Sequence, residues 1–467
     1  MPVAKTRART PLPVCDHRPA PYNGPARDEI LALRREFVNP GLLTYYQEPV
    51  CIVEGHMQYL WDETGKQYLD AIAGIVTVSV GHCHPKVTQA AREQIERLVH
   101  ATTIYLHPNL VLYAKALADH MPPGANLKSS YFTNSGSEAN DLAVLIARLH
   151  TRRHDVLSLR NCYHGGSPTA MSLTAVGTWK FPVATPGGVK HVPAGYCYRC
   201  PFGLEYPSCD LKCARSAEDV IRYETSGEIA CFIAEPIQGV GGAVTPPPEY
   251  FGIVYDIVRK AGGLCVADEV QTGWGRTGAH FWGFENWGVT PDMVVLAKGI
   301  ANGAPLGAVT TRPEIARPLA TRLHFNTFGG NPVSMAQALA TLEVIDEEHV
   351  QRRAAEVGGY LKEKLLELQE KHSAGAGAAA GSSRAVIGEV RGLGLMLGVE
   401  LVKDGQTREP ASAETASLVE AAKERGLLLG KGGLFGNVLR IKPPMCITKA
   451  DCDFLVDCLD ACLEEAR

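Results

Sequence analysis

The chain has 467 residues, of which 45% are apolar and 21% charged, and its formal net charge is −4. This length is enough for two or three domains around a large core, and the composition is ordinary for a globular protein. The charge gives no basic surface for nucleic acid, and no apolar run approaches the roughly 20 residues that a membrane-spanning helix requires. We therefore expect neither nucleic-acid binding nor membrane insertion.

The first 40 residues predict an N-terminal arm with little periodic signal before residues 27–37. The N-terminus is basic and rich in proline, without the apolar segment of a secretory signal. Residues 1–14 contain no acid, as in a transit peptide, but their prolines disfavour the amphipathic helix that such a peptide forms. We therefore predict a cytoplasmic protein, with the mitochondrial matrix as the alternative.

Two short runs at 58–61 and 67–70 flank a turn that ends in Gly65, and this pattern predicts a hairpin. Residues 85–99 and 109–120 have the apolar spacing of helices. None of these elements indicates chemistry by itself.

Residues 130–140 combine a short strand, a small polar loop and the start of a helix. Such a junction presents free backbone N–H groups and the positive end of the helix dipole to an anion. Ser135, Gly136 and Ser137 would therefore bind a phosphate. An ordinary helix cap is the alternative, because Ser135 and Glu138 have the spacing of a capping box.

Two further apolar runs end in residues suited to a site. The run 156–159 precedes Tyr163 and His164, and an aromatic ring at this position can lie flat over a planar ligand. An ordinary turn is equally compatible with the pattern. The run 231–234 closes on Glu235, as a buried strand that ends on an acid.

Fourteen cysteines in a chain without an export signal predict reduced thiols rather than a disulfide framework. Four of them form a C-x2-C-x8-C-x3-C pattern, at Cys197, Cys200, Cys209 and Cys213. Two close pairs separated by a short loop can hold a structural zinc ion in a tetrahedral thiolate site. The loop is shorter than the common spacing, so free thiols or a disulfide remain alternatives.

The stretch 264–298 contains two apolar runs, each followed by a charged residue: Asp268 after the first and Lys298 after the second. Their length and β-branched content indicate buried strands of a parallel sheet, beyond whose carboxyl ends ligands bind. A desolvated lysine amine forms a Schiff base with an aldehyde, and a carboxylate keeps a pyridine nitrogen protonated, which makes the ring an electron sink. Together these residues predict a pyridoxal 5′-phosphate site, although a lysine beside glycine is more often a turn residue.

The C-terminal part begins with a polar, glycine-rich loop that contains Thr327. A low-complexity insert occupies residues 373–383. Beyond it, a small α+β unit is predicted, with strands at 386–390, 394–402 and 437–442 and a helix at 413–425. Arg440 stands between apolar neighbours in the last strand, so its guanidinium needs an anion from the protein or from a substrate.

Taken together and in this order, the motifs resemble those of the class III pyridoxal-phosphate-dependent aminotransferases of fold type I. The resemblance runs from about residue 22 to the C-terminus, and its most specific part is the segment 265–273, with Asp292 and residues 297–299 at the family's spacing. Within the class, three segments most resemble the alanine-glyoxylate aminotransferase 2 subgroup, at 73–82, 326–332 and 445–448.

The resemblance implies an α/β fold of type I. A large domain would hold a mainly parallel seven-stranded sheet flanked by helices, and a small α+β domain would come from the N- and C-terminal segments. The expected boundaries are an arm at 1–40, the N-terminal part of the small domain at 41–75, the large cofactor-binding domain at 76–345 and the C-terminal part of the small domain at 346–467.

The resemblance also implies residue roles. Lys298 would bind the cofactor covalently and then move the substrate proton, and Asp268 would pair with the pyridine nitrogen. Further cofactor contacts would come from Ser135, Gly136, Ser137, Tyr163, His164, Val270, Gln271 and Thr327, the last of these from the neighbouring subunit of a homodimer. Arg440 would hold the substrate carboxylate and Glu235 would pair with Arg440 in its absence, while Ile75 would line the substrate pocket.

We therefore predict an aminotransferase that moves an amino group from L-alanine or a related donor to a small 2-oxo acid such as glyoxylate or pyruvate, by a ping-pong mechanism. One alternative is an ω-amino acid transaminase, of the ornithine, 4-aminobutyrate or β-amino acid type. Another is a mutase or decarboxylase on the same scaffold. The non-enzymatic alternative is a zinc-stabilised scaffold organised by the four cysteines.

Overall fold

The computed structural model describes residues 10–372 and 385–465, and its largest sheet has seven strands in the order β4-β10-β9-β8-β7-β5-β6. Strand β10 runs antiparallel to both of its neighbours, and the other pairs are parallel. The predicted α/β class with a mainly parallel seven-stranded sheet is therefore confirmed. The strands are β4 (Ser129–Thr133), β5 (Val156–Leu159), β6 (Val189–Val192), β7 (Cys231–Ala234), β8 (Leu264–Asp268), β9 (Met293–Leu296) and β10 (Gly307–Thr311).

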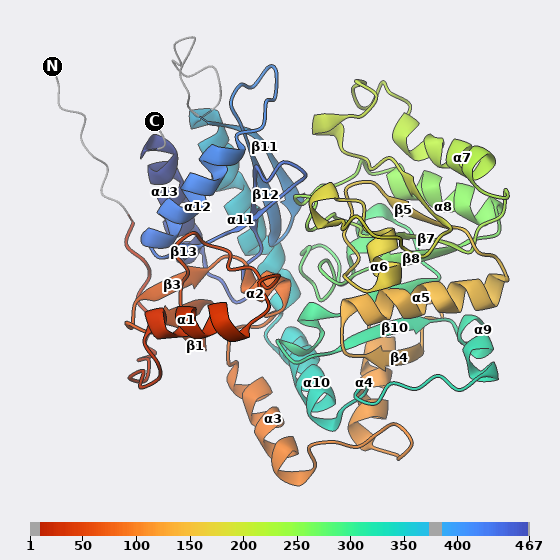
Figure 1. Ribbon diagram of the computed structural model, residues 1–467, viewed down its shortest axis with the longest axis horizontal. Helices are drawn as coiled ribbons and strands as arrows, with labels where there is room; N and C mark the ends of the chain where they lie inside the picture. The colour runs from red at the N-terminus through yellow and green to blue at the C-terminus, as the bar shows by residue number, and fades with distance from the viewer. Residues whose placement is uncertain (1–9, 373–384, 466–467) are drawn as a thin grey trace.

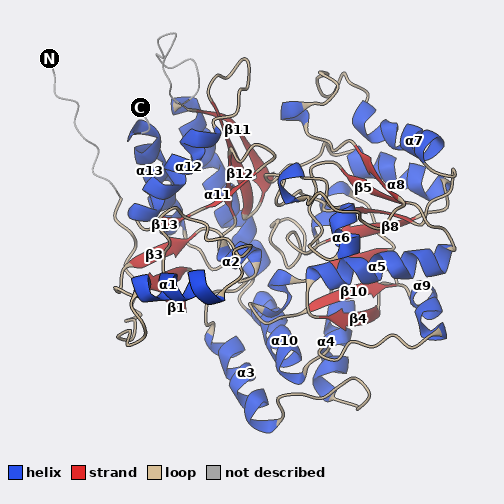
Figure 2. Cartoon of the chain, in the orientation of Figure 1, coloured by secondary structure: helices blue, strands red, loops and turns tan. Residues whose placement is uncertain are grey.

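Helices cover both faces of this sheet, as Figure 2 shows. In β7, Cys231 and Ile233 pack with α5 (Gly136–Thr151) on one face, whereas Phe232 packs with α7 (Lys212–Glu224) and α8 (Tyr250–Lys260) on the other. Because side chains alternate between the faces and both faces are buried, the strands are apolar throughout. The other helices of this part are α3 (Pro85–Arg97), α4 (Pro108–Asp119), α6 (Pro168–Leu173), α9 (Pro313–Ala316) and α10 (Pro332–Glu347).

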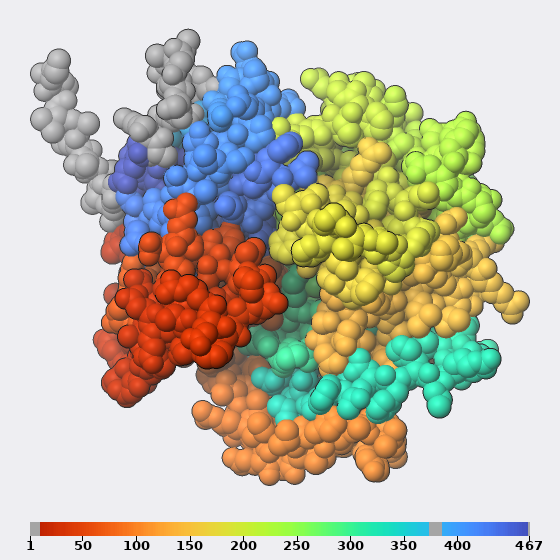
Figure 3. Space-filling view, in the orientation of Figure 1, coloured from red at the N-terminus to blue at the C-terminus, as the bar shows by residue number. Residues whose placement is uncertain are grey.

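A four-stranded sheet joins the two ends of the chain. It contains β1 (Ile52–His56), β2 (Tyr59–Asp62), β3 (Gln67–Asp70) and β13 (Leu427–Leu428). Strands β2 and β3 pair antiparallel, which confirms the predicted hairpin, and β13 pairs parallel with β3. The N-terminal segment (red) and the C-terminal segment (blue) therefore lie side by side in Figure 1, and their surfaces adjoin in Figure 3.

The C-terminal sheet has the order β11-β12-β15-β14, with β11 (Val386–Leu393), β12 (Met396–Val402), β14 (Gly430–Gly432) and β15 (Val438–Ile441). The remaining helices are α1 (Arg27–Phe37), α2 (Ala73–Val76), α11 (Val350–Lys371), α12 (Ser412–Glu424) and α13 (Lys449–Glu465). The predicted insert at 373–383 lies outside the described residues. Across the described part of the chain, every helix is too short or too polar to cross a membrane.

Candidate active site

A cavity of about 180 Å³ lies at the carboxyl ends of the parallel strands. Asp268 is the last residue of β8, and Lys298 follows β9 by two residues. The carboxyl ends of parallel strands meet at one edge of a sheet, so these two residues face the same cavity, as predicted. The wall is formed by Gly136, Ser137, Asn140, Tyr163, His164, Gly165, Glu235, Asp268, Val270, Gln271 and Lys298.

Asp268 is buried and held by three donors. Its Oδ2 accepts from His164 Nδ1 at 2.7 Å and from Asn140 Nδ2 at 3.0 Å, and its Oδ1 accepts from the Val270 N–H at 3.1 Å. Burial opposes a charge on His164, but the nearby Cys162 and the hydrogen bond to Asp268 together raise the pKa of His164 well above its ordinary value. Because Asp268 Oδ1 accepts from a single N–H group, it retains a lone pair for a further donor.

Lys298 is the candidate nucleophile. It begins the short helix η4 (Lys298–Ala301) with a backbone φ of 49°, in the left-handed region that a residue with a side chain rarely adopts. Such strain is typical of functional sites. Burial lowers the pKa of the Lys298 ammonium, with Asp268 and Glu235 acting in the opposite direction. The neutral amine is thereby favoured, and only a neutral amine can attack an aldehyde.

The N-terminus of α5 forms the opposite end of the cavity. Ser135 is the helix cap, because its Oγ accepts from the Glu138 N–H at 3.2 Å, and it does not line the cavity. Gly136 and Ser137 do line it. A Cβ on Gly165 would lie 2.2 Å from Ser137 Oγ, so only glycine fits beside this hydroxyl. The alternative of a helix cap is thus confirmed for Ser135, and phosphate binding stays a prediction for Gly136 and Ser137, which line the cavity at the helix N-terminus.

Gln271 is oriented by Lys442, a residue that the sequence analysis missed. Lys442 Nζ donates to Gln271 Oε1 and to the Gly239 carbonyl, both at 3.0 Å. In this contact the Gln271 oxygen faces Lys442, so the Gln271 NH2 group is left for another acceptor. The sequence signal was the spacing of Arg440 and Lys442, because residues two apart in a strand share a face.

Arg440 is buried, with 7% of its surface exposed, and its Nε has no hydrogen-bond partner in the described structure. Glu235 is close enough to act electrostatically on Arg440 but accepts instead from the N–H groups of Tyr163 at 2.9 Å and Gly239 at 2.7 Å. Within residues 10–372 and 385–465, the direct pair between Glu235 and Arg440 is not formed. Burial lowers the pKa of Arg440 and raises that of Glu235.

Three other predicted residues lie at the edge or outside of this cavity. Tyr163 lines it, and its ring packs edge-on against Trp179, with 4.9 Å between the ring centroids. Thr327 and Ile75 are exposed and do not line it. An exposed Thr327 is compatible with the predicted role toward a neighbouring subunit, because its side chain does not line the cavity of its own chain.

The predicted zinc site receives no support. Cys197 begins the short helix η2 (Cys197–Arg199), Cys200 follows that helix, and Cys209 and Cys213 flank the start of α7. Burial, followed by the three other thiols, raises the pKa of Cys197 to about 11, so the four share one region. Nevertheless all four are free, and nowhere in the described ranges do three or more metal-ligating side chains form a group that could hold a metal ion. Sequence spacing alone did not fix the positions of the sulfur atoms.

The cavity fits the predicted pyridoxal phosphate. An anion-binding helix terminus lies at one end, a carboxylate with a free acceptor site at the other, and a lysine amine at the wall. Gly136 belongs to this cradle because a Cβ there would lie 3.4 Å from Val270 Cγ2 and would narrow it. The residues that would hold the cofactor are therefore Gly136, Ser137, Asp268, Val270, Gln271 and Lys298.

The chain matches the family described as aminotransferase class-III over residues 44–463. It is 50% identical to the alanine-glyoxylate aminotransferase 2 homolog 2, mitochondrial, of Arabidopsis thaliana, over 96% of this chain and 90% of the relative. It is 41% identical to the alanine-glyoxylate aminotransferase 2, mitochondrial, of Homo sapiens, over 97% of this chain and 90% of the relative. Among solved structures, it is similar to an amine transaminase from an uncultivated Pseudomonas species in its PLP-bound form, with a TM-score of 0.84, 30% identity, and coverage of 92% of this chain and 99% of that one. The chain therefore belongs to the class III aminotransferases, within the alanine-glyoxylate aminotransferase 2 family, and is a transaminase of a class that implies pyridoxal phosphate as cofactor.

Proposed function

We propose that this enzyme transfers the amino group of L-alanine to glyoxylate, in two half-reactions that share one cavity. The observation that carries the proposal is the meeting of Lys298 and Asp268 in a cavity close to the buried, unpaired Arg440. The names of the two relatives support alanine and glyoxylate as the substrate pair.

Bound pyridoxal phosphate would supply an aldehyde for the amino group and a ring that takes up electron density from the substrate carbon. Lys298 would then act as base and acid. Its neutral Nζ would take the proton from the substrate α-carbon and would afterwards return a proton, which completes the removal of the amino group from the donor. Asp268, held by His164 and Asn140, would keep a proton on the ring nitrogen. Gln271, held by Lys442, would have its NH2 group free to donate to the cofactor.

Arg440 would bind the substrate carboxylate through its guanidinium, which pairs with carboxylates in a fork of two parallel hydrogen bonds. Glu235 is held by two backbone N–H groups in the structure and leaves Arg440 open. A change of the Glu235 rotamer toward Arg440 would neutralise the cation for donors without an α-carboxylate. When glyoxylate or pyruvate binds, its carboxylate would pair with Arg440, and Glu235 would return to the two backbone N–H groups.

The second candidate is an ω-amino acid or amine transaminase, which the similarity to the Pseudomonas amine transaminase supports. A panel of L-alanine, ornithine, 4-aminobutyrate and β-alanine, each with glyoxylate, pyruvate or 2-oxoglutarate, separates the two. We expect the highest kcat/KM for L-alanine with glyoxylate, measured as glycine formed. Release of carbon dioxide without glycine would instead indicate a decarboxylase, and conversion of the donor to an isomer without glycine would indicate a mutase.

We also propose that the active enzyme is a homodimer in which Thr327 contacts the cofactor phosphate of the partner. The exposure of Thr327 supports this arrangement. Thr327→Ala is expected to weaken cofactor binding without altering the fold of the monomer, measured by cofactor titration and sedimentation. A change in cofactor affinity at unchanged dimer content supports the role, and unchanged affinity opposes it.

For the organisation of the chain, we propose the arm, large domain and divided small domain with the boundaries given above; the shared sheet of β3 and β13 supports the division of the small domain. For the compartment, the word mitochondrial in the names of both relatives favours the matrix over the cytoplasm. A fluorescent fusion of residues 1–40 tests the location.

A further inference from the structure

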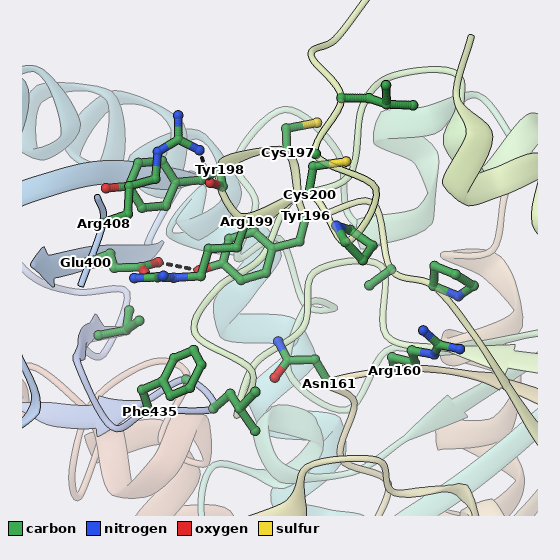
Figure 4. A pocket seen from close by; sticks show the side chains of 18 of the residues that line it. Arg160, Asn161, Tyr196, Cys197, Tyr198, Arg199, Cys200, Glu400, Arg408 and Phe435 are labelled. Carbon is green, nitrogen blue, oxygen red and sulfur yellow. Dashed lines mark hydrogen bonds and ion pairs between the residues drawn. The ribbon is translucent and has the colours of Figure 1, made fainter. Parts of the chain in front are cut away.

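A second and larger cavity, of about 940 Å³, lies between residues 193–206, which follow β6, and the C-terminal sheet (Figure 4). It shares no lining residue with the cavity around Lys298. Small-molecule sites typically measure about 300–1,000 Å³ and are frequent where two domains meet. The size and position of this cavity are therefore those of a ligand site.

The walls of the cavity carry an excess of positive charge. Arg160, Arg199 and Arg408 line it, and Figure 4 shows Arg160 and Arg408 on opposite sides. The buried Glu400 is already neutralised, because it pairs with Arg199 Nε at 2.5 Å and with Arg391 Nη1 at 2.6 Å. Arg160 and Arg408 form no ion pair with any residue that the structure describes, and the only other acid on the wall is Glu205. An anion would restore the balance.

Flat groups lie beside these cations. The guanidinium carbon of Arg199 is 5.6 Å from the Tyr198 ring centroid and 5.4 Å from that of Phe435. The guanidinium carbon of Arg408 lies 4.7 Å from the centroid of the same Tyr198 ring. Guanidinium planes and aromatic rings both stack on planar ligands, and Phe435 is 47% exposed, so its ring has a free surface.

We propose that this cavity binds an anionic ligand with a flat ring, of about the size of a mononucleotide. The ring stacks among Tyr198, Phe435 and Arg199, and the anionic group pairs with Arg408 or Arg160 in the charge-assisted geometry that guanidinium groups favour. Two wall residues lie near active-site residues in the chain, since Asn161 precedes Tyr163 by two residues and Val438 precedes Arg440 by two. The ligand site is nevertheless separate and does not depend on which amino donor the enzyme uses.

Calorimetric titration of the full-length, cofactor-loaded enzyme tests the proposal with three probes: AMP, adenosine and inorganic phosphate. The bound cofactor occupies the phosphate cradle at α5, so AMP cannot bind there. We expect AMP to bind once per chain with a Kd below about 1 mM, and adenosine and phosphate to bind at least about tenfold more weakly. AMP binding no tighter than that of either fragment would overturn the proposal.

The site is located with Arg160→Met and Arg408→Met, which remove the charge but keep an apolar stem. At least one of them is expected to weaken AMP binding about tenfold or more, as for loss of a charge-assisted hydrogen bond. The matched control is Arg352→Met on α11, since the Arg352 side chain is 71% exposed, pairs with Glu356 at 3.7 Å and does not line the cavity. Equal AMP binding by both pocket variants and the control rejects the site, and equal unfolding temperatures without AMP show that the variants are folded.

Discussion

Asp268 and Glu400 are both buried carboxylates held by cationic side chains, but they differ in what is left free. Glu400 uses both oxygens on protein groups: Arg199 and Asn437 contact Oε1, and Arg391 and Tyr196 contact Oε2. Asp268 accepts two donors on Oδ2 but only one backbone N–H on Oδ1. A saturated buried carboxylate stabilises the fold, whereas an unsaturated one can bind a ligand.

The two buried arginines of the same sheet differ in the same way. Arg391, in β11, is paired with Glu389 and Glu400. Arg440, in β15, has no ion pair among the residues that the structure describes, and its Nε is unpaired. An uncompensated buried cation costs several kcal/mol of folding free energy. This cost is the reason why we propose a carboxylate-binding role for Arg440 and a structural role for Arg391.

The largest effect is expected for Lys298→Ala. Loss of this amine should lower kcat by about 10⁴-fold or more, as for other residues that form covalent links to substrates or cofactors. Borohydride reduction followed by peptide mass spectrometry should find no cofactor attached to the chain. Unfolding in urea should be as in the wild type or require more denaturant, because a buried amine costs folding free energy. Substantial turnover by this variant would contradict the assignment.

The carboxylates form a matched pair of variants. Asp268→Asn is expected to lower kcat on the order of 10²- to 10³-fold, since the ring nitrogen loses its charged partner. Glu400→Gln should leave kcat nearly unchanged but should lower the free energy of unfolding by about 3 kcal/mol, because Arg391 and Arg199 lose their carboxylate. Steady-state kinetics measure kcat, and urea titrations measure the free energy of unfolding, for both variants. The same response from both would abolish the distinction between saturated and unsaturated carboxylates.

Arg440→Gln should raise the KM for alanine and for glyoxylate on the order of 10- to 100-fold, from the loss of about 1.5–3 kcal/mol in a charged hydrogen bond. The KM of a primary amine without a carboxylate should change much less, and this amine serves as the internal control. Stability is expected to remain or increase, unlike in Glu400→Gln. Equal changes for substrates with and without a carboxylate would place Arg440 outside the substrate contacts.

The smallest effect on activity is expected for Lys442→Met. The amide of Gln271 would lose the donor that fixes its orientation, so kcat/KM should fall about tenfold. Burial and Arg440 lower the pKa of Lys442 well below its ordinary value, so an apolar replacement of similar length should not destabilise the fold. A shifted absorbance maximum of the bound cofactor is the spectroscopic readout. Lys442→Arg, which restores a donor, is expected to recover part of that shift if the larger group is accommodated.

The sequence alone was sufficient to predict the location of site residues that stand at the end of a strand. Asp268 and Lys298 follow uninterrupted apolar runs, and the order of parallel strands brings their ends together. It was insufficient where the partner comes from a distant segment. The contact between Lys442 and Gln271 spans 171 residues, and no local pattern predicts it. For Glu235 the residue was found but its partners were not, because backbone N–H groups carry no sequence signature.

The cysteine cluster shows the limit of spacing rules. Two close pairs were compatible with a tetrahedral site, but a short helix and the start of α7 separate the four residues in the chain. The orientation of each sulfur then depends on local backbone geometry, which the pattern of spacings does not contain. Likewise, nothing in the sequence indicated the cavity between residues 193–206 and the C-terminal sheet, because its walls come from segments far apart in the chain.

During translation, β3 is synthesised long before β13, the strand with which it pairs in parallel. About 360 residues lie between Asp70 and Leu427, and at about 5–20 residues per second the ribosome needs roughly 20 to 70 seconds to make them. Until then the hairpin of β2 and β3 has one edge with unpaired N–H and C=O groups, which can pair with other chains. The seven-stranded sheet, whose strands all lie between Ser129 and Thr311, can form in the meantime. The edge of β3 therefore stays unpaired until a later stage of synthesis than the edges of the strands in the central sheet.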